Sequence, residues 1–496
     1  MSNVRLPLRG LITFATGSVG MGVWVTVPGL LLLYFLTDIL AVAPLLAGFV
    51  LLAPKILDVL LHPWVGRLSD ADLARRGHRR RLMLAGTALA VAFAALFAVP
   101  GLRGAPAGLW VAVAFIAGNL LFAAYQVPYL ATPADLSIGY HERTRLMGFR
   151  MVVLTVGILL SGVAAPLLAD LLGYAWMGLL LGIAMLAAML VGILGVRRLT
   201  VAAPGAQRGP SAVADPVQVA APEAQHGPSA VAAAVQTAAP EAQHGPSTIA
   251  APVQAAAPEA QHGPSAVAAP VRAAAGARHG LLASLRDRQF RTLVASYLAM
   301  STTTHLVLAA VPYFAEYELG RPKLTTVLVA AFVAPAILAT PVWVAVARRI
   351  GKQRGLLVAQ VAFVAGSLVL ALGAAGGLPL IVAAVAVLGV AFAAMQLLPF
   401  SMLPDVIAAS GPDGTIRAGG YTGVWTAAEA TGGALGPYVY AACLALGGFA
   451  ASAAGEHVTQ TPAALTAVRY GFALVPAALM TVAVLLQRRY TLDTGH

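Results

Sequence analysis

Twelve apolar segments, each long enough to cross a lipid bilayer, set the main constraint on this chain. A membrane-spanning helix needs about 20 predominantly apolar residues. Six segments of this length lie in the first part of the chain, near 11–36, 43–66, 82–101, 108–131, 148–169 and 174–196. Six more lie near 290–315, 325–347, 355–374, 377–403, 419–447 and 463–487. Because backbone polar groups must be bonded internally in hydrocarbon, we expect an all-α integral membrane protein with twelve transmembrane helices in two six-helix halves.

The composition and the positions of the basic residues support this expectation. The chain is 59% hydrophobic and only 10% charged, whereas a soluble domain carries about 25% charged residues. Its net charge of +12 comes mostly from short connections on alternate sides of the apolar segments. This pattern places both termini and the central linker in the cytoplasm and does not indicate nucleic-acid binding. The single cysteine, Cys443, excludes an intramolecular disulfide.

The region between the two sets of segments has a different character. Residues 201–280 contain repeats of an 18-residue unit rich in Ala, Pro, Gly and Gln and poor in large apolar residues. Such a segment cannot bury a core. We therefore predict three parts, namely an N-terminal half at 1–200, a disordered cytoplasmic linker at 201–280 and a C-terminal half at 281–496. Histidines recur in the repeats without a fixed geometry, so no metal site is expected there.

Two halves of six helices joined by a linker are typical of secondary transporters. The sequence contains no phosphate-binding loop ending in GK[ST], and no catalytic triad or metal cluster at usable spacing. We therefore expect neither an enzyme nor a cofactor, and transport driven by a gradient.

A motif after the second apolar segment narrows the family. Gly66-Arg-Leu-Ser-Asp70, followed by an arginine cluster, resembles the cytoplasmic loop motif of the major facilitator superfamily. The resemblance implies that Asp70 forms salt bridges across a cytoplasmic gate, with Arg76, Arg79 and Arg80 as its basic partners.

Further segments resemble one group within that superfamily, the glycoside–pentoside–hexuronide:cation symporters of the melibiose-permease type. The stretch from Lys55 through Asp58 and His62 to Gly66 follows this group's pattern on helix two. Segments around Pro128, Glu142 and Leu403 are also similar. The resemblance implies alternating access with cation-coupled uptake of a glycoside. The chain departs from the group where His62 replaces the second carboxylate of helix two and Gln126 replaces the acid of helix four.

Three ionisable residues are candidates for cation coupling. Asp58 and His62 are four residues apart and share one helix face, and ionisable residues inside the membrane usually face the bundle interior. Histidine titrates near neutrality, which favours proton exchange between the two. A structural ion pair of Asp58 with Lys55 or Arg150, and a sodium site, remain open. Glu429, in the middle of an apolar helix, is a candidate for proton relay or solute binding.

Seven residues are candidates for solute binding. Arg150 offers a fork of donors to carboxylates or hydroxyls, or else it anchors the helix at the membrane surface. The other six are suited to lining a pocket or stacking on a ring, but each is equally consistent with ordinary packing, and they are Trp24, Tyr125, Gln126, Tyr129, His305 and Trp425. Asp38 and Asp405 end their helices and are expected to act as loop caps.

The sequence thus predicts a multi-pass transporter of the inner (plasma) membrane that works as a monomer by alternating access. Its partners are a small-molecule solute, the lipid bilayer and a coupling ion, with H⁺ favoured over Na⁺. Symport of a glycoside or another small organic solute is the main hypothesis. An exporter or carrier of an amphipathic metabolite, lipid or drug is the first alternative, and a transport-inactive membrane sensor or scaffold is the second.

Overall fold

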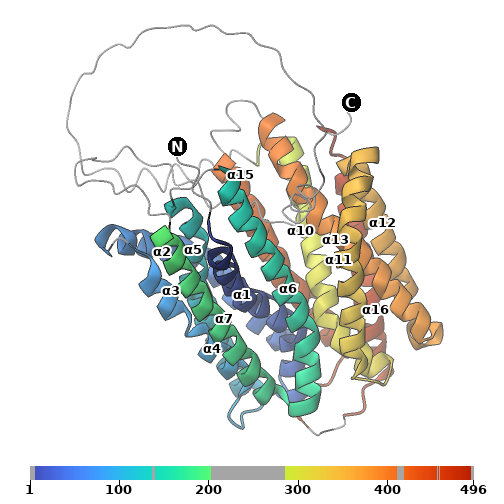
Figure 1. Ribbon diagram of the computed structural model, residues 1–496. Coiled ribbons are helices and arrows are strands. Elements are labelled where there is room, and N and C mark those ends of the chain that lie inside the picture. Colours follow the sequence, from blue (N-terminus) through green and yellow to red (C-terminus); the bar gives the residue numbers. More distant parts are fainter. Residues whose placement is uncertain are drawn as a thin grey trace.

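The computed structural model describes residues 6–76, 78–136, 140–202, 285–409, 418–454, 456 and 458–492. These residues form helices joined by short connections (Figure 1). The helices of the first half are α1 (Leu8–Tyr34) with a π-helical end η1 (Phe35–Ile39), α2 (Pro44–Arg76), α3 (Arg80–Gly86), α4 (Leu89–Phe97), α5 (Gly104–Asp135), α6 (Tyr140–Leu172) and α7 (Tyr174–Ala202). The helices of the second half are α10 (Arg288–Tyr313) with its own π-helical end η2 (Phe314–Glu318), α11 (Leu324–Ile350), α12 (Lys352–Leu370), a short 3₁₀ turn η3 (Gly373–Gly376), α13 (Leu378–Ala409), α15 (Ala418–Leu446) and α16 (Pro462–Gln487).

The all-α membrane fold is confirmed. Ten helical spans in the described part of the chain are long and apolar enough to cross a membrane. The two remaining expected spans correspond to α2 and α15, which have 33 and 29 residues. The count of twelve spans stays a prediction for these two. The linker predicted at 201–280 lies outside the described residues, apart from the last turn of α7.

Two helix boundaries differ from expectation. We expected the second helix to break at Gly66–Asp70, but α2 continues through this motif to Arg76. The residues that follow Gly66 include good helix formers, and Arg76 pairs with Asp72 one turn earlier at 2.5 Å, which supports the last turns of the helix. The span expected at 82–101 is divided into α3 and α4 at Thr87, whose hydroxyl donates to the Leu84 carbonyl at 2.7 Å and so competes with the regular helix bonds.

Each half is built around its first helix. In the first half α1 packs against α6 and α7, and in the second half α10 packs against α15 and α16. Glycine allows these close approaches, as is common in membrane helices. A methyl group on Gly192 of α7 would lie 2.6 Å from the Cα of Gly17 on α1, and one on Gly436 of α15 would lie 2.6 Å from the Leu306 nitrogen on α10. Gly436 thus allows the close packing of α15 on α10.

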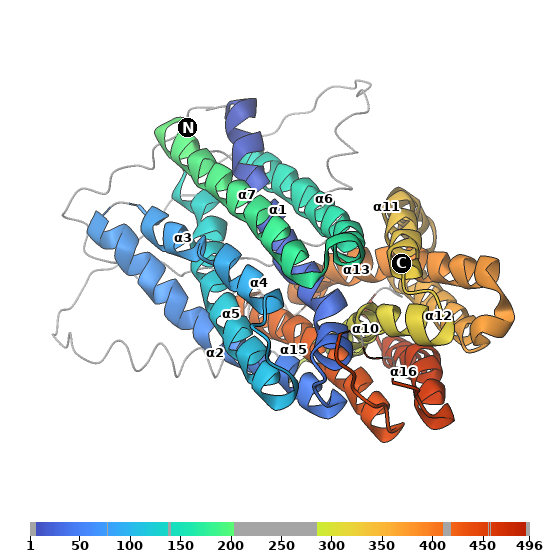
Figure 2. The same ribbon diagram turned by 90° about the horizontal axis from the view of Figure 1, so that it is seen from below.

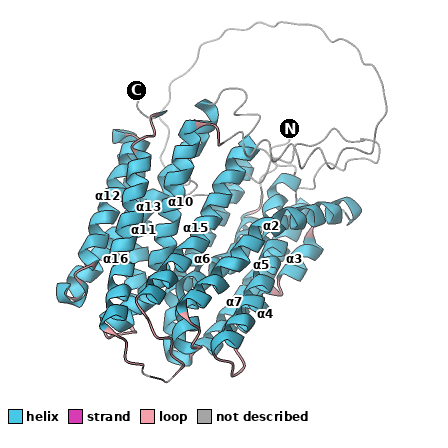
Figure 3. Cartoon of the chain, turned by 180° about the vertical axis from the view of Figure 1, so that it is seen from behind, coloured by secondary structure: helices cyan, strands magenta, loops and turns pink. Residues whose placement is uncertain are grey.

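Among the described residues, the two halves meet mainly along three pairs of helices, which are α1 with α10, α2 with α15 and α6 with α11. Seen along the bundle, α1, α2, α10 and α15 lie next to one another between the two halves (Figure 2). The cartoon of Figure 3 shows the same division from behind. We call the end of the bundle at which α1 ends the outer end, because the distribution of basic residues predicts that it faces away from the cytoplasm.

Candidate functional site

His305 lies where the two halves meet. Its Nδ1 is 2.8 Å from the Ser301 carbonyl on the same helix, and its ring faces Gly433 of α15, where an added methyl group would lie 3.4 Å from Nε2. Lys55 of α2 is close enough to act on His305 electrostatically, and its Nζ lies 5.9 Å from the centre of the Phe115 ring. A histidine of the second half therefore faces a lysine of the first half across the interface.

Glu429 lies beside this contact, on α15. Its carbonyl accepts a hydrogen bond from the Ser301 hydroxyl at 3.2 Å, and its carboxyl group lies next to the hydroxyl of Tyr297. The Tyr297 ring in turn stacks on Trp425, with 4.1 Å between ring centres and 19° between planes. Glu429 is thus an acid on α15 whose carboxyl group has a hydroxyl partner.

Arg150 is the most unusual charge in the first half. Its side chain, on α6, is only 3% exposed. The guanidinium lies 5.8 Å from the Tyr129 ring centre, and its Nη1 lies 3.6 Å from the Met151 sulfur. Its Nε has no hydrogen-bond partner, and no carboxylate among the described residues forms an ion pair with it. A buried cation without an anionic partner lowers the stability of the fold. Arg150 is therefore expected to serve function and not stability.

The two tyrosines beside Arg150 are held firmly by the first half. Tyr125 donates to the Met189 carbonyl at 3.2 Å, and Tyr129 donates to the Phe14 carbonyl at 2.5 Å. Their rings stack with 5.4 Å between centres. Both side chains are fully buried beside Arg150, within the core of the first half. Gln126, between them in the sequence, is half-buried.

Both candidate tryptophans are packed within their own halves. Trp24 is 2% exposed, and Phe93, Phe115 and Phe122 surround its ring at 5.5 to 6.3 Å. Trp425 is 0% exposed and also contacts Phe400 at 5.4 Å. This arrangement corresponds to the packing alternative for both residues.

Several predicted residues fall where side chains are not described. Asp58, His62, Gly66 and Asp70 all lie within α2, but their side chains are outside the described residues, so the proposed pairing of Asp58 with His62 and the gate contacts of Asp70 stay predictions.

The structure describes contacts of the three basic partners predicted for Asp70, while any contact with Asp70 itself lies outside the described residues. Arg76 pairs with Asp72, a residue that sequence reasoning did not single out. Arg79 donates to the Ser69 hydroxyl of α2 at 2.9 Å, and Arg80 donates to the Thr200 hydroxyl of α7 at 3.0 Å. The arginine cluster thus joins α2, α3 and α7 at one end of the bundle.

The expectation that Asp38 acts as a loop cap is wrong. Asp38 lies within η1 and is 5% exposed. Its carboxylate accepts hydrogen bonds from Thr37 of its own turn and from Tyr317 of the other half. One signal in the sequence was available, because a Tyr-Phe pair followed by an acid recurs at Tyr34 and at Tyr313.

The same expectation for Asp405 is also wrong, because α13 continues past it to Ala409. Asp405 accepts a hydrogen bond from the Lys352 ammonium group at 2.6 Å and pairs with that lysine at the surface.

Two small cavities lie beside the contact between η1 and η2 at the outer end of the bundle. One, of about 170 Å³, is lined by Tyr34, Asp170, Tyr174 and Glu316 among other residues. The other, of about 230 Å³, is lined by Tyr34, Asp38, Glu316, Tyr317 and Glu456 among others. Both cavities are therefore lined in part by acidic residues.

The turn after η1 contains a strained residue. Ala41 has a φ of 54°, a left-handed conformation that costs a residue other than glycine about 1 kcal/mol. Its N–H donates to the Ser452 carbonyl at 2.9 Å, so the conformation serves a contact between the halves. We expect Ala41→Gly to leave the thermal stability unchanged or slightly higher, and Ala41→Val to lower it, because a β-branched side chain is worst suited to this conformation. Melting of the two purified variants tests this, and equal melting temperatures would contradict it.

Comparison with known proteins identifies the family. The model of the family described as MFS/sugar transport protein matches residues 13–210 and 253–494. The chain belongs to this family. This membership agrees with the expectation of a transporter and not an enzyme, and it confirms the relationship to the symporter group expected from the helix-two motif.

Curated relatives align over part of the chain. An uncharacterized symporter of Synechocystis sp. is 32% identical over 34% of this chain and 32% of its own length. An Escherichia coli protein named as a candidate glycoside/cation symporter is 26% identical over 33% of this chain and 36% of its own length. The sodium-dependent lysophosphatidylcholine symporter 1 of Xenopus tropicalis is 28% identical over 32% of this chain and 30% of its own length. The chain thus spans about a third of the length of the relatives it matches.

Solved structures share the fold at low identity. The structure of a bacterial homolog of the human lysosomal transporter Spinster, described as inward-facing and unoccupied, aligns with a TM-score of 0.57 and 14% identity. The alignment covers 98% of this chain and 97% of that one. At this identity the likeness shows the multi-pass transporter fold alone.

Proposed function

We propose that the chain is a secondary active transporter that carries a glycoside or another small polar solute by alternating access, together with a proton. The observation that carries the proposal is Arg150, a buried guanidinium whose Nε has no partner among the described residues, in a chain of the sugar-transport family. Its donors suit solute hydroxyls or carboxylates. The half-buried Gln126 on the neighbouring helix α5 is a further candidate contact.

Proton coupling is favoured by the ligands that the site offers. Sodium requires several hard oxygen ligands, as other hard cations do, whereas Asp58 is accompanied by His62 one turn away. Histidine exchanges protons near neutrality. Glu429, held beside the Tyr297 hydroxyl, supplies a second proton-binding group in the other half, close to His305.

A carrier of amphipathic compounds is the second candidate. It is favoured by the packing of Trp24 and Trp425 inside the two cores, because these rings are then not available to stack on a sugar. The relative named as a lysophosphatidylcholine symporter supports the same direction. In either case we place the protein in the inner membrane, as a monomer with both termini and the linker in the cytoplasm. A transport-inactive sensor would show no flux of any solute.

The test is solute flux into proteoliposomes under imposed proton or sodium gradients, with a panel of glycosides and of amphipathic compounds. We expect a proton gradient to drive uptake in the parent. Asp58→Asn and His62→Ala are each expected to reduce gradient-driven uptake by about tenfold or more. Asp405→Asn is the matched control, because Asp405 pairs with Lys352 at the surface at 2.6 Å, where an ion pair contributes little.

The other outcomes separate the hypotheses. Uptake driven by sodium and unaffected by His62→Ala would overturn proton coupling. Flux of amphipathic compounds alone would favour the second candidate.

A further inference from the structure

The two halves exchange tyrosine–carboxylate hydrogen bonds at the outer end. Tyr34 of α1 donates to Glu316 of η2, and Tyr317 of η2 donates to Asp38 of η1. Each half thus supplies one phenol and one acid to the other. A third hydrogen bond joins the Thr37 and Tyr313 hydroxyls at 2.6 Å. We call Tyr34, Asp38, Glu316 and Tyr317 the outer latch.

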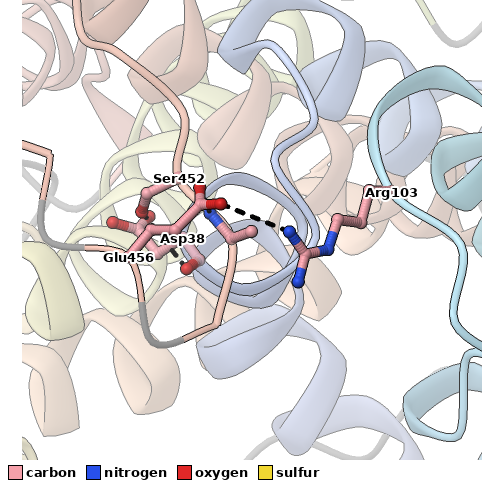
Figure 4. A network of polar contacts seen from close by, with 5 residues as sticks. Asp38, Arg103, Ser452 and Glu456 are labelled. Atoms are coloured by element: carbon pink, nitrogen blue, oxygen red, sulfur yellow. Dashed lines mark hydrogen bonds and ion pairs between the residues drawn. The ribbon is translucent and has the colours of Figure 1, made fainter.

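A segment of the second half covers this latch. Residues 449–454, after α15, run antiparallel to the chain that leaves η1, with a β-bridge between Leu40 and Ala453. The Ser452 N–H donates to the Thr37 carbonyl at 2.8 Å, and the Ala454 N–H donates to the Ile39 carbonyl at 3.0 Å. Nearby, Arg103 of the first half pairs with Glu456 at 3.3 Å. Figure 4 shows Asp38 and Ser452 close together, with the Arg103–Glu456 pair beside them. The structure is therefore closed at its outer end.

The charges around Asp38 do not neutralise it. No basic side chain among the described residues contacts its carboxylate. The titratable groups that act on it or line the adjoining cavities are mostly phenols and acids, namely Tyr34, Tyr174, Tyr313, Tyr317, Tyr440, Asp170, Glu316 and Glu456. The described basic groups of this region face other acids, since Arg103 pairs with Glu456, Arg469 pairs with Glu318 of η2 and Lys323 acts on Asp170. Closing the outer end thus brings Asp38 and Glu316 together where no described basic side chain pairs with either of them.

We propose that the outer latch is a proton-operated gate, in which protonation of the Asp38–Glu316 pair holds the outer end closed and loss of the proton releases it. When the halves separate, both carboxylates return to water, where the charged form is well solvated. In the closed state the charged form is desolvated, and each acid lies near the other. The closed state therefore binds a proton more tightly than the open state, and by linkage acid must favour closure.

The two cavities give the latch a route for that proton. Both are lined by Tyr34 and Glu316, and the larger one also reaches Asp38, Glu456 and Thr459. Cavities of this size with polar walls can hold water, which would carry a proton to and from the two acids. The latch needs neither Asp58 nor Glu429, so its operation does not depend on the solute or coupling ion proposed above.

The test is the distance between spin labels on the outer ends of the two halves, measured without solute in acidic and in mildly alkaline buffer. The labels are placed at Ala105→Cys, at the start of α5, and at Ala375→Cys in η3, both exposed, in full-length protein with Cys443→Ala. We expect the short-distance population to grow in acid in the parent. In Asp38→Asn, which imitates the protonated acid, the short distance should persist in both buffers and the pH response should be lost.

A second variant tests the sign of the effect. Tyr317→Phe keeps the carboxylate but removes its donor from the other half, so the closed population should fall in alkaline buffer and recover in acid. Asp170→Asn is the control, because Asp170 lines one cavity but makes no hydrogen bond of the latch, and its pH response should match the parent. A parent distance that ignores pH, opening in acid, or an unchanged pH response in Asp38→Asn would each overturn the proposal.

Discussion

Replacing Arg150 with methionine is expected to abolish solute transport and to leave the protein as stable as the parent, or more stable. Methionine is unbranched and fills irregular space in a core, and the guanidinium already lies against Met151 at 3.6 Å. Removing a buried charge that has no carboxylate partner among the described residues relieves a desolvation penalty of several kcal/mol. Stability and activity should therefore change in opposite directions, as is common for residues kept for function.

The expected loss of transport follows from the hydrogen bonds that a guanidinium makes. Each hydrogen bond from a charged donor contributes about 1.5–3 kcal/mol, and a fork of two supplies at least about 3 kcal/mol. Since 1.4 kcal/mol corresponds to a factor of ten, the transport rate at low solute concentration should fall by about 100-fold or more. Arg150→Lys should restore only part of it, because an ammonium group cannot make the paired contacts of the fork.

Arg145→Met is the matched control on the same helix. Arg145 pairs with Glu142 at 3.3 Å, and its side chain is 41% exposed, so its removal should change both transport and stability little. Solute uptake into proteoliposomes and thermal melting in detergent measure the two effects. If Arg150→Met transports at the parent rate, Arg150 does not bind the solute. If it melts well below the parent, the charge is part of the fold.

The sequence identifies the spanning helices because hydropathy is a local property. Each apolar run is long enough to define one helix regardless of its neighbours, and ten of the expected spans qualify in the structure. Hydropathy does not predict where a helix ends once the chain becomes polar. Gly66 and the polar residues after it indicate a break, yet α2 continues to Arg76, because the good helix formers among them and the ion pair of Arg76 with Asp72 support the last turns.

The role of a polar or aromatic residue depends on contacts that the sequence does not display. Asp38 looks like a cap because it ends an apolar run, but its partner Tyr317 is 279 residues away in the chain. Trp24 and Trp425 look equally suited to a pocket and to a core, because an aromatic side chain on an apolar helix can face either. The packing of the neighbouring helices determines which way each ring faces, and both rings lie in the core of their own half. Arg150 is found from sequence as a candidate, whereas its lack of an acidic partner among the described residues becomes visible only in three dimensions.

Replacing Gly389 with alanine is expected to destabilise the second half strongly, although the change adds only one methyl group. Gly389 lies on α13 where this helix crosses α11, and an added Cβ would lie 1.9 Å from the Phe332 carbonyl oxygen and 2.7 Å from its carbonyl carbon. These atoms belong to the backbone, so no side chain can turn away. The two helices must separate, which also disturbs the contact between the Phe332 and Phe392 rings, 5.1 Å apart. Overpacking of this kind costs about 1–3 kcal/mol or more.

Gly148→Ala separates this steric cost from helix propensity. Gly148 is also helical, on α6, but an added methyl group there meets no atom of the described residues within 4 Å. Alanine is favoured over glycine in a helix by about 1 kcal/mol, so Gly148→Ala should raise the melting temperature slightly, while Gly389→Ala should lower it or prevent recovery of monodisperse protein. Both substitutions gain the same propensity, and their difference therefore measures the contact between α11 and α13. If the two variants melt together above the parent, these helices lie farther apart than the structure shows, and the second half does not pack as described.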